Sequence, residues 1–256
     1  MTHTTCNCPK GNSLADMKSK LLISGFILSA AILIAGCDTD FIDGIDAIQT
    51  DNYANSRLEY YYYIPATVVK DRQTPHPILV MIPGLSSRGE QFASQEFKEF
   101  ARKENLLIVA PSFVYDEANW ASEQSYQYPA VWSGQALLAI TSYVTEKYQV
   151  STSKMYLFGF SAGAQFALRF CLWRPELCMA CAAHAGGGIV IPEKKVNAKF
   201  FVTVGSQDSI RVDKAATFYE SAQELGIDVV YKEYNIGHTL TQAQIKDSLD
   251  FFRSVK

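Results

Sequence analysis

The chain has 256 residues, 48% of them hydrophobic, which is enough to bury one sizeable core but not two large ones. Its formal charge is −3. Residues 1 to 37 hold three lysines and one aspartate, so the remainder has 20 basic and 25 acidic residues and a charge of −5. No basic patch or run of Lys and Arg occurs, which argues against a nucleic-acid partner. No feature indicates an obligate protein partner.

The N-terminal segment has the layout of a bacterial secretory signal. Two lysines follow Met17, an apolar run covers residues 21–35, and small residues precede Cys37. The run is too short for a comfortable membrane-spanning helix. Residues 1–16 fit no part of such a signal, so Met17 is an alternative start of the protein.

The sequence Ile34-Ala35-Gly36-Cys37 resembles the lipobox of bacterial lipoproteins. The resemblance implies a signal peptide over residues 1–36, lipidation of Cys37, and a lipoprotein in the cell envelope of a bacterium, facing the periplasm or the exterior. Membrane contact would then be made through this N-terminal lipid anchor. An ordinary cleaved signal and an uncleaved anchor are the alternatives.

Residues 38 to about 55 are acidic and polar, with only scattered apolar residues. This composition is typical of a solvated tether. We therefore expect a tether over residues 37–55, which starts at the lipidated cysteine, and a folded domain over residues 56–256.

Strand and helix patterns alternate through this domain. Apolar or β-branched runs typical of strands cover residues 58–68, 76–84, 106–113, 154–160, 199–208 and 228–238, with a short apolar run at 178–187. Helical spacing covers residues 90–105, 134–148, 162–175, 213–226 and 241–254. The alternation predicts an α/β fold with a doubly wound, mostly parallel sheet and helices on both faces.

The stretch "LFGFSAG", residues 157–163, places Ser161 where a predicted strand turns into a predicted helix. A sharp turn of this kind exposes a serine side chain above the sheet edge, and its neighbours must be small to let strand and helix approach. Gly159 and Gly163 supply that space. The first N–H of the helix, from Ala162, is available to a developing oxyanion.

A serine nucleophile needs a base and an orienting carboxylate. Asp208 and His238 each come just past the carboxyl end of a predicted strand, the edge where open parallel sheets place their sites. Their order along the chain, after Ser161, is that of α/β-hydrolases. Asp213 is the alternative acid. His184, which follows the strand after the elbow helix, is expected to be a buried, hydrogen-bonded histidine, with a role as catalytic base as the weaker alternative.

Residues 56–256 resemble an α/β-hydrolase, and within it the secreted group of polyhydroxybutyrate-depolymerase-like and feruloyl-esterase-like enzymes. The matching stretches are "MIPGLSS", "KMYLFGFSAGAQFA", "GSQD" and "IGHTL". The resemblance implies that the N–H of Leu85, which follows Pro83-Gly84, is the second oxyanion donor. A histidine often precedes that glycine in the group, and Pro83 departs from this pattern.

The long stretch over residues 114–132 is rich in Tyr and Trp, which indicates a loop that lines a pocket. Trp120 and Trp132 are candidate substrate-binding residues, with packing over the core as the alternative. Three cysteines lie outside the N-terminal segment, and Cys171 could pair with Cys178 or Cys181, or all three could be free.

These patterns predict a serine hydrolase that cleaves carboxylic esters, small or polymeric, through an acyl-enzyme, with Ser161, His238 and Asp208 as catalytic residues. The chemistry requires no cofactor, and we expect no metal site. Two alternatives remain. The same residues could serve peptide hydrolysis or acyl transfer, or the fold could be a catalytically silent binding module of the envelope.

Overall fold

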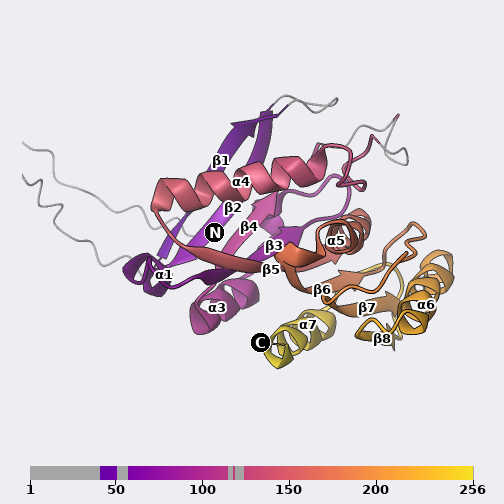
Figure 1. Ribbon diagram of the computed structural model, residues 1–256. Helices are drawn as coiled ribbons and strands as arrows, with labels where there is room; N and C mark the ends of the chain where they lie inside the picture. The colour runs from indigo at the N-terminus through magenta and orange to yellow at the C-terminus, as the bar shows by residue number, and fades with distance from the viewer. Residues whose placement is uncertain (1–40, 51–56, 115–117, 119–123, 256) are drawn as a thin grey trace, which may run out of the picture. The chain divides into compact units, whose positions relative to one another are not determined.

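The computed structural model describes residues 41–50, 57–114, 118 and 124–255, which form one eight-stranded sheet with helices against it (Figure 1). The strands are β1 (Phe41–Gln49), β2 (Arg57–Pro65), β3 (His76–Ile82), β4 (Leu107–Pro111), β5 (Thr152–Phe160), β6 (Cys178–His184), β7 (Lys199–Gly205) and β8 (Val229–Tyr234). The helices are α1 (Ala66–Lys70), α2 (Gly89–Phe92), α3 (Gln95–Glu104), α4 (Ser133–Tyr148), α5 (Ala162–Trp173), the 3₁₀ turn η1 (Pro175–Leu177), α6 (Ser209–Glu224) and α7 (Gln242–Ser254).

The strands lie in the order β1-β2-β4-β3-β5-β6-β7-β8. Pairing is antiparallel between β1 and β2 and between β2 and β4, and parallel from β4 through β8. Parallel strands covered on both faces are mainly apolar, as the buried stretches of β3 to β7 are. The predicted doubly wound, mostly parallel α/β class is confirmed.

Each face of the sheet has its own core. Along β3, Ile78 and Val80 belong to the cluster under α4, α5 and α6, whereas Leu79 and Met81 belong to the cluster under α3 and α7. Figure 1 shows α4 and α5 on one side of the sheet and α3 and α7 on the other. The alternation follows from the two-residue period of a strand.

The expected tether is wrong for residues 41–49, which form β1 at the edge of the sheet. The apolar side chains are few because an edge strand buries one face only partly, but Ile42 and Ile48 do pack against the core. Two acidic residues also have partners: Asp43 accepts a hydrogen bond from the Tyr61 hydroxyl at 3.0 Å, and Asp46 pairs with Lys147 at 2.7 Å. The folded domain therefore begins earlier than residue 56.

Two further expectations differ in detail. The strand expected over 58–68 ends at Pro65, and α1 follows it. The helix expected over 90–105 is divided into α2 and α3, because Ser94 is extended and begins a new helix. No helix in the part of the chain that the structure describes is long and apolar enough to cross a bilayer.

Candidate active site

The nucleophile turn lies between β5 and α5, and its backbone is strained. Ser161 has φ 56° and ψ −117°, a conformation that non-glycine residues rarely adopt and that costs about 1–3 kcal/mol. Its main-chain N–H donates to the carbonyl oxygen of His184 at 2.8 Å. This hydrogen bond links the turn to the end of β6.

The two glycines of the turn are required by space. A Cβ on Gly163 would lie 2.0 Å from the carbonyl oxygen of Ile82, and a Cβ on Gly159 would lie 2.3 Å from that of Gly163. Only glycine allows α5 to approach β3 and β5 this closely. The predicted reason for small residues around Ser161 is confirmed.

Ser161, His238 and Asp208 meet at the carboxyl edge of the parallel strands. The Nε2 of His238 lies 3.1 Å from the Oγ of Ser161, and its Nδ1 lies 2.8 Å from Oδ2 of Asp208. With Nδ1 protonated, the imidazole donates to the carboxylate and Nε2 can accept the serine proton. The Asp208 side chain is only 4% exposed, whereas that of His238 is 33% exposed.

Two neighbours hold this arrangement. The ring of Phe160 stacks on His238 with centroids 4.9 Å apart and planes at 22°. Arg211, in the first turn of α6, donates from Nη1 to the second carboxylate oxygen of Asp208 at 2.9 Å. Each oxygen of Asp208 therefore has one partner. The contact of Arg211 with Asp208 was not predicted, because α6 was expected to begin at Asp213, four residues after its observed start.

Of the two predicted oxyanion donors, Ala162 directly follows Ser161. Ala162 is the first residue of α5, and the first N–H of a helix has no acceptor within the helix. On the other side, the residue before Leu85 is close to the serine: a Cβ on Gly84 would lie 3.4 Å from the Cβ of Ser161. The role of the Leu85 N–H stays a prediction. The buried Tyr126 hydroxyl donates to the carbonyl oxygen of Pro83 at 3.2 Å and fixes this loop.

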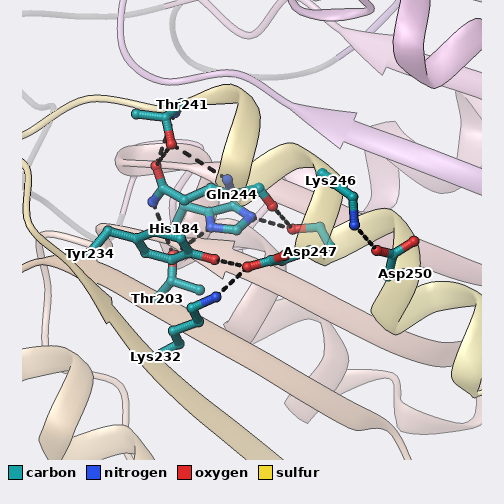
Figure 2. Close-up of polar contacts among 10 residues, drawn as sticks. His184, Thr203, Lys232, Tyr234, Thr241, Gln244, Lys246, Asp247 and Asp250 are labelled. Carbon is teal, nitrogen blue, oxygen red and sulfur yellow. Dashed lines mark hydrogen bonds and ion pairs between the residues drawn. The ribbon is translucent and has the colours of Figure 1, made fainter.

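His184 is buried behind the turn and takes part in a hydrogen-bonded network with β7 and α7 (Figure 2). Its Nδ1 lies 2.6 Å from Oγ1 of Thr203, and its Nε2 lies 2.9 Å from Oγ of Ser248. Because Ser248 donates its own proton to the carbonyl oxygen of Gln244, it accepts from Nε2–H, and Nδ1 accepts from Thr203. Complete burial lowers the pKa of His184 to about 3, so the ring is neutral.

The same network reaches the loop that carries His238. Gln244 donates from Nε2 to Thr203 at 3.1 Å, and its Oε1 accepts from the main-chain N–H of Thr241 at 2.9 Å. Thr241 and Gln244 form a capping box at the start of α7, three residues after His238. Figure 2 shows Gln244 between His184 and Thr241. The expectation of a buried, hydrogen-bonded His184 is confirmed. Its weaker alternative, a catalytic base, is not supported, because both ring nitrogens are bonded inside the protein.

The other residues predicted for the site have different positions in the structure. Asp213 is exposed on α6, and His238 bonds to Asp208 instead. Trp132 donates from its indole to the carbonyl oxygen of Gln124 at 2.7 Å and packs edge-on against Phe113, so its substrate contact stays a prediction. Trp120 and Cys37, with the predicted signal peptide, lie outside the described residues.

Three cysteines of the domain are buried free thiols, Cys171, Cys178 and Cys181. Burial, followed by hydrogen bonds with the other two thiols, raises the pKa of Cys171. Of the alternatives left open by the sequence, the structure therefore has the one without a disulfide among these three cysteines.

Comparison with solved structures identifies the fold. A ferulic acid esterase from Anaeromyces mucronatus superposes with a TM-score of 0.64 at 16% identity, over 86% of this chain and 91% of that one. An S-formylglutathione hydrolase from Agrobacterium tumefaciens has a TM-score of 0.64 at 15% identity, over 84% and 94% of the two chains. The domain has the α/β-hydrolase fold.

A third neighbour of this fold is the fluorophosphonate-binding serine hydrolase F of Staphylococcus aureus, with a TM-score of 0.64 at 12% identity, over 85% of this chain and all of that one. No family model matches the chain, and no curated protein sequence matches it. These α/β-hydrolase neighbours share little sequence identity with the chain, so the structural similarity shows the fold but not the reaction. The reaction has to be inferred from the residues of the site.

Proposed function

We propose that this protein is a serine hydrolase that cleaves carboxylic esters through an acyl-enzyme. One observation carries the proposal: His238 lies within hydrogen-bond distance of Ser161 on one side and Asp208 on the other. A serine hydroxyl paired with an imidazole that a buried carboxylate orients is an activated nucleophile.

The steps follow from this geometry. Ser161 Oγ attacks the ester carbonyl while its proton passes to Nε2 of His238, and the oxyanion forms between the N–H groups of Leu85 and Ala162. The imidazolium, held by Asp208, gives the proton to the leaving alcohol as the bond between carbonyl carbon and alkoxy oxygen breaks. A water molecule, deprotonated by His238, then hydrolyses the acyl-enzyme and restores the serine.

A finer assignment rests on the sequence resemblance. We place the protein in the polyhydroxybutyrate-depolymerase-like and feruloyl-esterase-like group of secreted esterases, anchored in a bacterial envelope through lipidated Cys37. The lipobox-like sequence supports the anchor. Expression of the full chain with Cys37→Ala tests it: the parent should sediment with membranes and carry acyl mass on its N-terminal peptide, and the variant should do neither.

The reaction is tested with p-nitrophenyl acetate and butyrate on the full-length protein and on Ser161→Ala. Turnover should fall by about ten-thousand-fold or more in the variant, with the circular dichroism spectrum unchanged. An anilide of the same acyl group and a competing alcohol, assayed in parallel, separate ester hydrolysis from amide hydrolysis and acyl transfer. Near-parental ester turnover in Ser161→Ala would refute the proposal.

A further inference from the structure

A second hollow lies beside the C-terminal half of α5. This cleft has a volume of about 520 Å³, and neither Ser161 nor its two partners line it. Its walls come from Arg169 and Trp173 on α5, from Tyr128 ahead of α4, and from the loop between β6 and β7. The cleft is therefore built from three separate parts of the domain.

Arg169 brings a positive charge to this cleft that is in no salt bridge among the described residues. Its guanidinium stacks on the ring of Tyr128 at 4.2 Å and donates to three neutral oxygens: the carbonyls of Gln127 and Ile189 and the side-chain amide of Gln165. Within the described part of the chain, no carboxylate is paired with it. Burial lowers the pKa of Arg169, which shows that the charged form is partly desolvated.

A half-buried cation without an anion is an unfavourable arrangement that a bound anion would relieve. Three hydrogen bonds hold the guanidinium in place, and the loop backbone lies close to it: a Cβ on Gly188 would lie 2.1 Å from Oε1 of Gln165 and 3.2 Å from Nη2 of Arg169. Planar donors fixed in this manner suit a carboxylate. Lys194 adds a second cation to the lining, against one carboxylate, Glu193.

The rest of the cleft is apolar and exposed. Ile189 and Ile191 are 59% and 55% exposed, values that are unusual for large aliphatic side chains placed together on one wall. Trp173 forms part of the opposite wall. A ligand that satisfied Arg169 would thus lay its remaining atoms against aliphatic and aromatic surface.

We propose that this cleft is a second binding site, for an amphipathic carboxylate. The carboxylate binds Arg169, assisted by Lys194, and the apolar body lies against Trp173, Ile189 and Ile191. The proposal does not depend on Ser161 being a nucleophile, because none of the residues that carry it belongs to that site.

The test is calorimetric titration of the full-length protein with octanoate, with octan-1-ol and acetate as matched ligands that lack the charge and the chain, respectively. Octanoate should bind at least ten times more tightly than either one. Arg169→Gln should weaken octanoate binding at least tenfold. Lys246→Gln, a change to an exposed cation on α7 outside the cleft, should leave it unaltered.

Ile191→Glu provides a second variant whose folding is not at risk, because the side chain is on the surface. It places a carboxylate on the apolar wall and should also weaken octanoate binding at least tenfold. Three results would overturn the proposal: no binding of octanoate, equal binding of octan-1-ol, or unchanged octanoate affinity in folded Arg169→Gln. If Arg169→Gln does not fold, unchanged affinity in Ile191→Glu overturns it instead.

Discussion

The main-chain N–H of Ser161 is bonded to the carbonyl oxygen of His184 at 2.8 Å, and the side chain of His184 is bonded to β7 and α7. One buried histidine thus joins the strained serine turn to the helix that follows the His238 loop. Buried hydrogen bonds therefore hold the backbone of the turn, whereas His238, which contacts the Ser161 hydroxyl, is 33% exposed.

Acid should destabilise the fold through His184. Its pKa is about 3 in the folded state and about 6.5 in an unfolded chain, so below pH 6.5 the unfolded state binds the extra proton. Stability should therefore fall as pH falls, by about 1.4 kcal/mol per unit between roughly pH 6 and pH 3 from this group. Urea unfolding at pH 6, 5 and 4 measures the slope.

The matched variant for this measurement is His184→Gln. All other titrating groups are shared, so the difference between the two slopes isolates residue 184. The variant should be less stable at pH 7, because the network is broken, yet its stability should depend less steeply on pH. Parallel slopes would show that His184 does not contribute to acid sensitivity.

Adding one methyl group to the turn should be costly. Gly163→Ala places a Cβ 2.0 Å from a main-chain oxygen that cannot move aside, and overpacking of this kind costs about 1–3 kcal/mol or more. Gly237→Ala is the control, because no atom lies within 4 Å of its Cβ and the change should be within about 0.5 kcal/mol. Thermal or urea unfolding compares the two. Equal stability of both variants would contradict the steric account.

Arg211 should position Asp208. Arg211→Met removes the partner of one carboxylate oxygen and frees the carboxylate to turn away from His238, so kcat should fall about tenfold while KM is retained. Arg211→Lys, which keeps a cation, should recover part of the loss. A loss confined to KM would instead place Arg211 in substrate binding.

The three buried thiols should be protected in the folded protein. Cys171, Cys178 and Cys181 should resist alkylation by iodoacetamide until the protein is unfolded, since burial keeps all three out of solvent and raises the pKa of Cys171. Peptide mass spectrometry without reduction measures the alkylation of each cysteine separately. Disulfide-linked peptides among the three would contradict the structure.

Short-range patterns predicted much of this molecule. Ser161, Asp208 and His238 come within a few residues after the carboxyl ends of β5, β7 and β8, and parallel strands bring such ends to one edge. β1 was missed because an edge strand needs few apolar residues, and its aspartates find partners, Tyr61 and Lys147, far along the chain.

Other features were missed for two different reasons. The contact of Arg211 with Asp208 is local, three residues apart, and was missed because the start of α6 was misplaced. The partners of the buried His184 could not be named, because they lie as far as 64 positions away. The cleft at Arg169 also joins three distant segments. Residues of this kind are found only once the chain is folded.

The central claim is that His238 activates Ser161. It is tested most directly by labelling the full-length protein with a fluorophosphonate probe, beside Ser161→Ala and His238→Ala. The account predicts that the parent is labelled at Ser161, that Ser161→Ala is not labelled, and that His238→Ala is labelled far more slowly. Unaltered labelling of either variant, or no labelling of the folded parent, would contradict it.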